Sequence, residues 1–456
     1  MRSSNLKKAD MKKFLFILAG FSVLSLNAQK KWSLRECVDY AVKNNLQVIQ
    51  NEYNKQNQDA NLKIAKNNYL PTVSANVGNN VSFGQASLGT GSIRNDRFSN
   101  NANIGADVLL YNNGRLEKTI RKTQFDVEAS QYDIETIKND ISLQIAQQYL
   151  NALLNKEIVK INQSAVSNAQ KQFDRSKATT EVGTTAQTVL AEASAALARE
   201  KQNLKTAEIN VGRSLFALAQ LLQLRDYKDF DVENVDVSDQ LTPQLVAVDE
   251  VLTTAYENQP QIKAAEIRIK SAEAQTVVTR TAFYPTLTAS VGIGSFYNNL
   301  LNTNNVGSDF FYVSEKSFFQ QYKSNFGQQA GLSLNVPIFN KGITRLQVEQ
   351  SKINESIAKN NYEQQKFAVR QSVQQAQFDA NANYEIYIAA TEAEKNTKLS
   401  LDFSEKSYAA GRSTIFDVNI ARNNYANAQG SVAQSKYNYL FSLKLLNFYA
   451  GIPLTL

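Results

Sequence analysis

The stretch LPTVSANVGNNVSF, residues 70–83, reads as a long β-strand with two different faces. From Thr72 onward, polar residues or glycine fill its even positions, and apolar residues fill most odd ones: Val73, Ala75, Val77, Val81 and Phe83. A period of two residues is typical of a strand with one apolar and one polar face. The surrounding sequence carries Ala, Gln, Asn, Lys, Glu and Leu at helical spacing, so this strand needs partners from elsewhere in the chain.

A second copy of the motif shows that the chain is duplicated. LPTVSANVG at 70–78 corresponds to YPTLTASVG at 284–292, an offset of 214 residues. Beyond the strands the offset becomes 228, where VLLYNNG at 108–114 matches VPIFNKG at 336–342. The longer offset indicates a longer loop in the second copy.

The duplication defines the expected domain organisation. We predict a first structural repeat at 29–222 and a second at 247–456. The segment 223–246 between them is acidic and contains Pro243, and we interpret it as a linker or small side element with a solvated surface. A cation site among its acids is the less favoured alternative.

Each repeat is predicted to contain one β-hairpin, at 70–111 in the first copy and at 284–339 in the second. All four strands alternate apolar with polar or glycine residues; in the last one Leu332, Leu334, Val336 and Ile338 are the apolar members. Each strand has about ten residues or more, the length that a tilted transmembrane β-strand requires.

Two very long helices are predicted to follow the hairpins. Arg115 to Val182 and Ile343 to Ala410 are 68-residue tracts without glycine or proline. A continuous helix of that size is roughly 100 Å long. A narrow apolar seam at steps of three and four residues predicts packing on neighbouring helices as in a coiled coil; its members are Ile134, Ile137, Ile141, Ile145, Leu150, Leu154, Ile158, Ile161 and Ala165.

The N-terminus is predicted to be a signal peptide, residues 1–28. Lys12 and Lys13 precede an apolar run from Phe14 to Leu26, and small residues end at Ala28. Met11 is an alternative start. A membrane anchor is the other interpretation, but the run is shorter than the roughly 20 residues that a spanning helix needs.

Composition excludes several functions. The formal charge is +7, of which residues 1–28 contribute +4, so the remaining +3 does not support nucleic-acid binding. The chain contains no histidine, which excludes histidine-dependent metal sites and Ser-His-Asp or Cys-His catalysis. Cys37 is the single cysteine, and we interpret it as a buried apolar residue of an amphipathic helix. No cofactor, metal site or enzymatic activity is expected.

Four strands cannot form a membrane barrel alone. Every backbone polar group in lipid must be paired, so the sheet must close, and the smallest such barrels have about eight strands. Several subunits must therefore combine, and three of them supply twelve strands.

The duplicated helix-hairpin-helix plan resembles the TolC-like outer-membrane efflux proteins. The junctions NNYLP and AFYPT and the segment YAAGRSTIFDVNIARNNYANAQ at 408–429 carry the resemblance. It implies an α+β membrane protein and a homotrimer: a twelve-stranded β-barrel in outer-membrane lipid continues into a periplasmic α-helical barrel. It also implies an exit duct of a tripartite efflux or type I secretion system, with a periplasmic adaptor (membrane fusion) protein and an inner-membrane RND or ABC transporter as partners.

The resemblance also implies a constriction at the periplasmic tip, formed by the turns at Gly183–Thr184 and Gly411. Tyr408 and Asp417 stand at positions of the family's constricting network. This chain departs from that pattern: Ser413 replaces the expected arginine, with Arg412 one place earlier, and Val189 replaces an aspartate of the first copy. For Asp417, a helix N-terminal acid that favours the helix dipole is an equal alternative.

Two further interpretations stay open from the sequence. A trimeric coiled-coil adhesin or structural envelope protein with an outer-membrane barrel is the rival function, although its four strands would lie together at the C-terminus. The aromatic loop from Tyr297 to Gln328 either faces the cell exterior as a girdle or cap, or forms a collapsed cluster.

Overall fold

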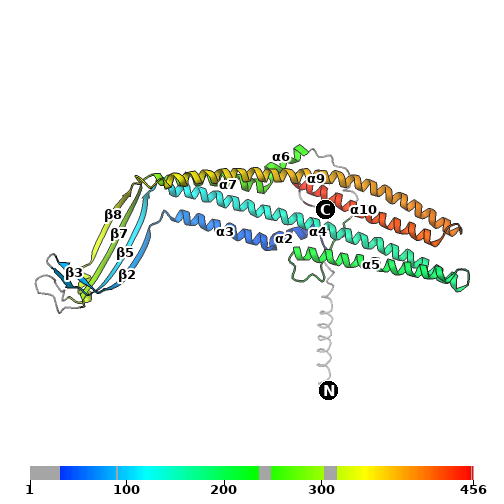
Figure 1. The fold of residues 1–456 in the computed structure, drawn as a ribbon, viewed down its shortest axis with the longest axis horizontal. Helices are drawn as coiled ribbons and strands as arrows, with labels where there is room; N and C mark the ends of the chain where they lie inside the picture. The colour runs from blue at the N-terminus through cyan, green and yellow to red at the C-terminus, as the bar shows by residue number, and fades with distance from the viewer. Residues whose placement is uncertain (1–30, 89–90, 236–247, 302–315, 453, 455–456) are drawn as a thin grey trace, which may run out of the picture. The chain divides into compact units, whose positions relative to one another are not determined.

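The computed structural model describes residues 31–88, 91–235, 248–301, 316–452 and 454 (Figure 1). Its contacts divide the chain into two compact units. A helical unit contains the residues up to Glu52 together with 132–263 and 364–456, and a strand-bearing unit contains 53–131 and 264–363. Each unit therefore takes one part from either sequence repeat. The predicted signal peptide lies outside the described residues.

The strand-bearing unit holds one four-stranded antiparallel sheet, visible side by side in Figure 1. Its order is β2 (Thr72–Ser82), β5 (Arg97–Tyr111), β7 (Thr286–Leu300) and β8 (Gly327–Asn335). One hairpin falls in each predicted range, and β5 pairs with β7 to join the two hairpins. Hairpins that are far apart in sequence thus form a single sheet.

The structure corrects two details of the hairpins. The loop expected between the first two strands contains a short ribbon of β3 (Gln85–Leu88) and β4 (Gly91–Arg94). The last strand ends at Asn335, so Val336 and Ile338 lie beyond it although they continue the alternation. Pro337 explains the early end, because proline has no backbone N–H for the ladder.

The helices come in pairs of equal or nearly equal length. The two longest, α4 (Arg115–Glu181) and α9 (Ile343–Ala409), each have 67 residues and agree with the predicted tracts. The other pairs are α2 (Leu34–Asn44) with α6 (Val248–Asn258), α3 (Leu46–Asn67) with α7 (Pro260–Arg280), and α5 (Gln187–Leu221) with α10 (Ile415–Tyr449); the short helix α8 (Phe318–Ser324) has no counterpart in the part of the first copy that the structure describes. Among the described residues, no helix is both long and apolar enough to cross a bilayer.

The duplication is also visible in the backbone, where rare positive φ angles recur at matched positions of the two copies. Positive φ angles recur 228 residues apart at Gly183 and Gly411, and at Asn113–Gly114 and Lys341–Gly342. A further pair is Gln223 and Gly451, with φ of 57° and 81°. The left-handed region is unfavourable for residues other than glycine. Its recurrence at matched positions shows that both copies make the same turns before their longest helix and after their long helices.

The core of the helical unit surrounds a small parallel sheet, β1 (Lys31–Trp32) with β6 (Asp231–Val232). The segment predicted as a linker or side element therefore supplies a strand. Tyr149 of α4 is fully buried, and its hydroxyl lies 3.1 Å from the Trp32 carbonyl oxygen and 3.2 Å from that of Glu233. Lys156 donates to the Val232 carbonyl at 2.7 Å and forms an ion pair with Asp231. These contacts tie the sheet to α4.

The predicted apolar seam of α4 faces this core. Five of its members are buried, namely Ile134, Ile141, Ile145, Leu150 and Leu154, and Ile137, Ile158 and Ile161 are partly buried against them. Cys37 is also buried here, as predicted, and burial raises the pKa of its thiol to about 12.

Candidate functional site: a two-faced sheet and two helix turns

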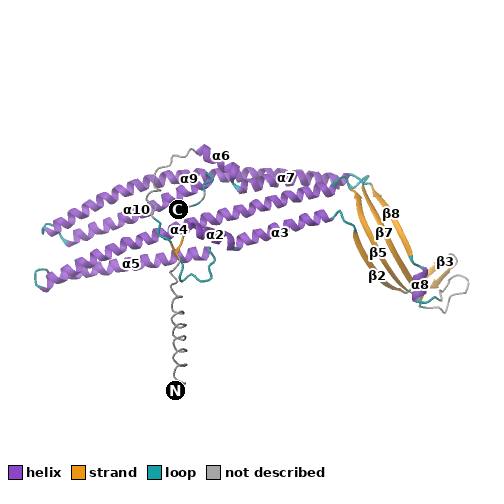
Figure 2. Cartoon of the chain, turned by 180° about the vertical axis from the view of Figure 1, so that it is seen from behind, coloured by secondary structure: helices purple, strands orange, loops and turns teal. Residues whose placement is uncertain are grey.

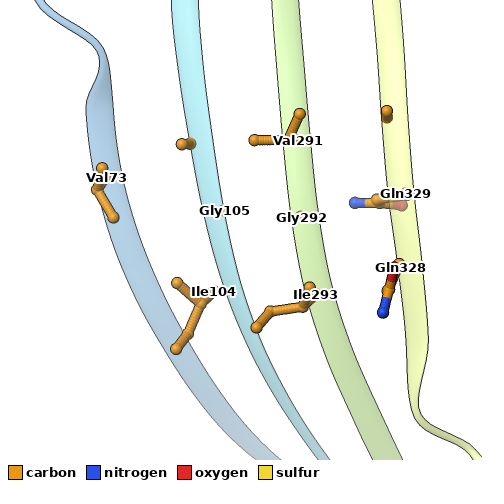
Figure 3. Close-up of a pocket in the computed structure, with 10 residues that line it drawn as sticks. Val73, Ile104, Gly105, Val291, Gly292, Ile293, Gln328 and Gln329 are labelled. Atoms are coloured by element: carbon orange, nitrogen blue, oxygen red, sulfur yellow. The ribbon is translucent and has the colours of Figure 1, made fainter.

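The register of the sheet sorts its side chains into two faces. Val73, Ala106, Val291 and Ala330 lie side by side across all four strands. The same register brings together the rest of what we call the apolar face: Ala75, Val77, Ala102, Ile104, Val108, Leu287, Ala289, Ile293, Leu332 and Leu334. Figure 3 shows Val73, Ile104, Val291 and Ile293 around a shallow hollow of about 510 Å³ on neighbouring strands.

The opposite, polar face carries hydroxyls, amides and glycine. One row consists of Thr72, Asp107, Ser290 and Gly331, and the next of Ser74, Gly105, Gly292 and Gln329. Side chains on this face are closely spaced: a Cβ atom added to Gly78 would lie 2.7 Å from Oδ1 of its cross-strand partner Asn101. This face is therefore suited to contact with water and polar solutes.

The apolar face is exposed in the single chain. Val291 at its centre is 57% exposed, and Leu332 is 71% exposed. Contiguous apolar surface of this kind marks a membrane or protein contact. Removing it from water lowers the free energy by roughly 25 cal/mol for each Å² of apolar surface. Ladders join the four strands in order, so the backbone groups between neighbouring strands are paired as contact with lipid requires, apart from a bulge between Leu109 and Tyr111.

Aromatic side chains bracket the apolar face at both ends. Tyr69, Tyr111, Phe283, Tyr284 and Phe339 are half exposed or more at the end that joins the helices. At the other end a cluster is formed by Phe98, Tyr297, Phe318, Phe319 and Tyr322. Thirteen residues separate Tyr284 from Tyr297, which is about 43 Å along a strand or roughly 33 Å for a strand tilted by about 40°. Transmembrane barrels typically have an aromatic girdle on either side of an apolar band about 25 Å tall. The spacing between the two aromatic groups is therefore large enough to enclose such a band.

The aromatic loop from Tyr297 to Gln328 is partly ordered into structure that sequence reasoning missed. It contains a seven-residue helix, α8 (Phe318–Ser324), and Tyr297 still belongs to β7. Phe310, Phe311 and Tyr312 of the same loop lie outside the described residues.

The sheet is open at both edges. In the part of the chain that the structure describes, no strand pairs with the outer edge of β2 or of β8. Unpaired edges of eleven and nine residues are unfavourable in lipid, where each backbone group needs a partner. The site therefore requires further copies of the sheet.

The predicted turns at Gly183 and Gly411 have the same geometry. Thr184 donates from its backbone N–H to the Thr179 carbonyl at 3.0 Å, and Arg412 donates to that of Ser407 at 2.9 Å. Together with the N–H bonds of the two glycines, these contacts form Schellman motifs. Both glycines have a φ above +70°, which explains why the sequence has glycine there.

The helices that follow the turns begin differently. Thr414 and Asp417 form a reciprocal capping box at the start of α10, in which Asp417 Oδ2 accepts from the Thr414 N–H at 2.9 Å and from its hydroxyl at 2.7 Å. These bonds hold the pKa of Asp417 below its usual value. In the first copy Ala186 precedes α5 without a side-chain cap. The cap is in place at neutral pH and is lost as pH falls through the lowered pKa.

The other candidate residues lie around the second turn without forming a network. Tyr408 is half-buried, Arg412 is exposed, and the Ser413 hydroxyl lies 3.5 Å from the Ser404 carbonyl. Among the described residues of one chain, Tyr408 and Asp417 share no hydrogen bond. Within one chain Asp417 therefore acts as a helix cap.

An ion pair that sequence reasoning missed fastens α9 to α10. Arg422 donates to Glu405 Oε1 from Nε at 3.0 Å and from Nη2 at 2.6 Å. The two residues are 17 positions apart on either side of the turn. Their opposite charges were the only feature of the sequence that could have predicted the ion pair. Arg422 also lines a groove of about 630 Å³ formed by α4, α5, α9 and α10. Its walls combine apolar residues such as Leu401, Phe416 and Ile420 with polar residues such as Asn168, Glu200 and Asn423.

The difference between the two caps gives a testable prediction. Thr414→Ala should cost about 1 kcal/mol of helix stability and speed amide hydrogen exchange in the first turn of α10. The matched variant Ala186→Thr with Val189→Asp adds the missing capping box to α5, and it should slow amide exchange in the first turn of that helix. Unchanged exchange in both variants would show that neighbouring helices, not the caps, hold these turns.

A sheet with one apolar and one polar face, open at its edges and bounded by aromatic side chains, defines an outer-membrane β-sheet protein. The chain belongs to the outer membrane efflux protein family, whose model matches residues 38–223 and 251–451. The family match confirms the resemblance, the fold class and the outer-membrane location expected from the sequence.

Individual relatives agree with the family. The chain is 27% identical to outer membrane protein TolC of Escherichia coli (strain K12) over 312 residues, which cover 68% of this chain and 60% of TolC. The match thus spans less than two thirds of that relative. Among solved structures, the CusC transmembrane channel has a TM-score of 0.73 at 18% identity, with 92% of each chain covered. The CmeC outer membrane channel of Campylobacter jejuni has a TM-score of 0.72 at 20% identity, covering 92% of this chain and 85% of CmeC.

Proposed function

We propose that three copies of this chain form an exit duct through the outer membrane. The single observation that carries the proposal is the register of the sheet, which places a continuous apolar face opposite a continuous polar face. In a closed arrangement of twelve strands the apolar face contacts lipid and the polar face lines a water-filled lumen. Closure also pairs the free edge of β2 with the free edge of β8 of the next copy, so that no backbone group stays unpaired in lipid.

The long helices extend the duct into the periplasm in this proposal. A helix of 67 residues is about 100 Å long, and Figure 2 shows α4 and α9 each returning through a turn into α5 and α10. A periplasmic adaptor protein and an inner-membrane pump of the RND or ABC type are the proposed partners. The groove lined by Arg422, Asn423 and Phe416, which combines polar and apolar walls, offers a surface on which an adaptor can dock. The duct transfers solutes without a chemical step, and the cargo is set by the pump.

Recording from planar lipid bilayers tests the duct directly. The purified protein should produce discrete conductance steps, because its lumen is continuous and lined by polar groups. Folded, membrane-inserted protein without any conductance would contradict the proposal. The adhesin alternative is disfavoured by the position of the strands, since the two hairpins that form the sheet are separated by more than 170 residues of sequence.

We also propose that the turns at Gly183–Thr184 and Gly411 form the periplasmic entrance, with Tyr408, Arg412, Ser413 and Asp417 near the pore axis. Tyr408→Phe and Asp417→Ala should then raise single-channel conductance, because a hydroxyl and a carboxylate that can bond between subunits are removed. Thr414→Ala is the control, since it breaks the same helix cap but keeps the carboxylate. A rise in Asp417→Ala alone supports a gate, whereas an equal rise in Thr414→Ala would assign the effect to the cap.

A further inference from the structure

The helix α8 lies at the end of the sheet remote from the long helices (Figure 2), and its contacts place it on the apolar face. Its position follows from contacts to residues whose register assigns them to that face. The Ser295 hydroxyl donates to the Tyr322 carbonyl at 2.6 Å. The Tyr322 hydroxyl donates to Asn100 Oδ1, and Asn100 in turn donates to Asn79 at 2.6 Å. Asn79 and Asn100 are direct cross-strand partners, in line with Val77 and Ala102.

The helix is firmly attached where β8 no longer pairs with β7. The last paired residues are Gly294 and Gly327, so the β7 edge continues without a strand partner from Ser295 to Leu300. Gln321, which is 6% exposed, takes the place of a strand: its side-chain oxygen accepts from the Asn298 N–H and its nitrogen donates to the Asn298 carbonyl, both at 3.1 Å. Asn325 donates to the Phe296 carbonyl at 2.8 Å.

The other side of α8 carries large apolar surface away from the sheet. Phe318 and Tyr322 stack at 4.6 Å between ring centroids, whereas Phe319 is 82% exposed, and Phe326, just beyond the end of the helix, is 53% exposed. Lys323 is exposed four residues after Phe319, so the two side chains share one side of the helix. An exposed aromatic ring next to an exposed lysine on a short amphipathic helix is typical of the boundary between lipid and water.

We propose that α8 is an interfacial helix that contacts the outer leaflet of the membrane. Phe319 and Phe326 contact the acyl chains next to the headgroups, and Lys323 extends toward lipid phosphate. The inference rests on the proposed function, because it takes the apolar face as the lipid-facing one. The exposed apolar side chains at α8 lie beyond the polar residues Asn79, Asn100 and Ser295 that end the apolar face. The attachment through Gln321 fixes the height at which the sheet sits in the bilayer.

Single-tryptophan variants test this inference in trimers reconstituted with lipids brominated at known depths. Trp32 is the only native tryptophan, so Trp32→Phe is included in every variant. Phe319→Trp should lose more fluorescence with bromine near the headgroups than with bromine near the chain ends. Val291→Trp, at the centre of the apolar face, should show the opposite order. Ser290→Trp, one residue away on the polar face, should not be quenched by either lipid.

The outcomes separate the inference from the proposed function. If Val291→Trp is not quenched, the apolar face does not contact lipid and the duct proposal fails. If Val291→Trp is quenched as expected but Phe319→Trp is quenched by neither lipid, α8 contacts another subunit or water, and the inference is overturned. Quenching of Phe319→Trp mainly by deep bromine would also overturn it.

Discussion

Val291→Arg should largely prevent the protein from folding in the outer membrane. Val291 lies midway between the two aromatic ends of the apolar face, and an arginine at the midplane of a lipid-facing strand costs about 2–4 kcal/mol. Three copies of the variant in one barrel multiply this cost. The measurements are the amount of trimer recovered from outer membranes and the midpoint of guanidinium unfolding in lipid vesicles.

The matched control is Ser290→Arg, which places the same side chain on the opposite face of the same strand. Ser290 is the cross-strand partner of Asp107, so an arginine here has a carboxylate opposite to it and faces water in the proposed lumen. This variant should insert and unfold like the unmodified protein. If both variants were tolerated equally, or if Ser290→Arg were the more damaging, the assignment of the two faces would be wrong.

Tyr149→Ala should be the most destabilising single change in the helical unit. The side chain is fully buried and joins α4 to the β1–β6 sheet, and truncating a large buried aromatic residue costs about 3–5 kcal/mol. Tyr149→Phe, which removes only the hydroxyl, should cost about 1 kcal/mol. Burial raises the pKa of the Tyr149 hydroxyl, so it stays a neutral donor across the physiological range.

Trp32 provides the readout for this pair of variants. Its ring lies 5.3 Å from that of Tyr40 and 5.8 Å from that of Phe230, between centroids, so its emission reports local unfolding at the sheet. The control is Asn151→Ala on the exposed side of α4, which should change the unfolding midpoint little. A small effect of Tyr149→Ala would show that the β1–β6 sheet contributes little to the stability of the helical unit.

The strands and long helices were predictable because their signals are local. The alternation in LPTVSANVGNNVSF spans enough residues to define two faces, and glycine at 183 and 411 marks left-handed turns. Pairing partners were not predictable in detail. The early end of β8 depends on Pro337, and the ribbon of β3 and β4 is too short for its alternation to stand out.

The parts of the site that sequence reasoning missed are held by contacts distant in the chain. Seven residues are too few for a helical period, so the capping pattern Ser-x-x-Gln at 317–320 was the only signal for α8. Its anchor Gln321 binds the backbone of Asn298 in another element. Arg422 and Glu405 meet only because α9 and α10 run side by side. By contrast, the pattern Thr-x-x-Asp at 414–417 is a recognisable helix start, and Asp417 lies in the first turn of α10 as an N-terminal acid.

The central claim is that β2 of one subunit pairs with β8 of the next. These strands form opposite edges of the four-stranded sheet, so within one chain they are about 14 Å apart, beyond the reach of roughly 7 Å for a disulfide. Cysteine pairs in a Cys37→Ala chain, one at Ser74 or Asn76 and one at Gln329 or Ser333, can therefore only link different subunits.

Oxidation of cells carrying these cysteine pairs is the decisive measurement. For at least one pair, a denaturing gel should show a ladder that ends at a covalent trimer. Folded, membrane-inserted protein that remains monomeric for every pair would show that the edges of the sheet are not joined between subunits, and would contradict the account.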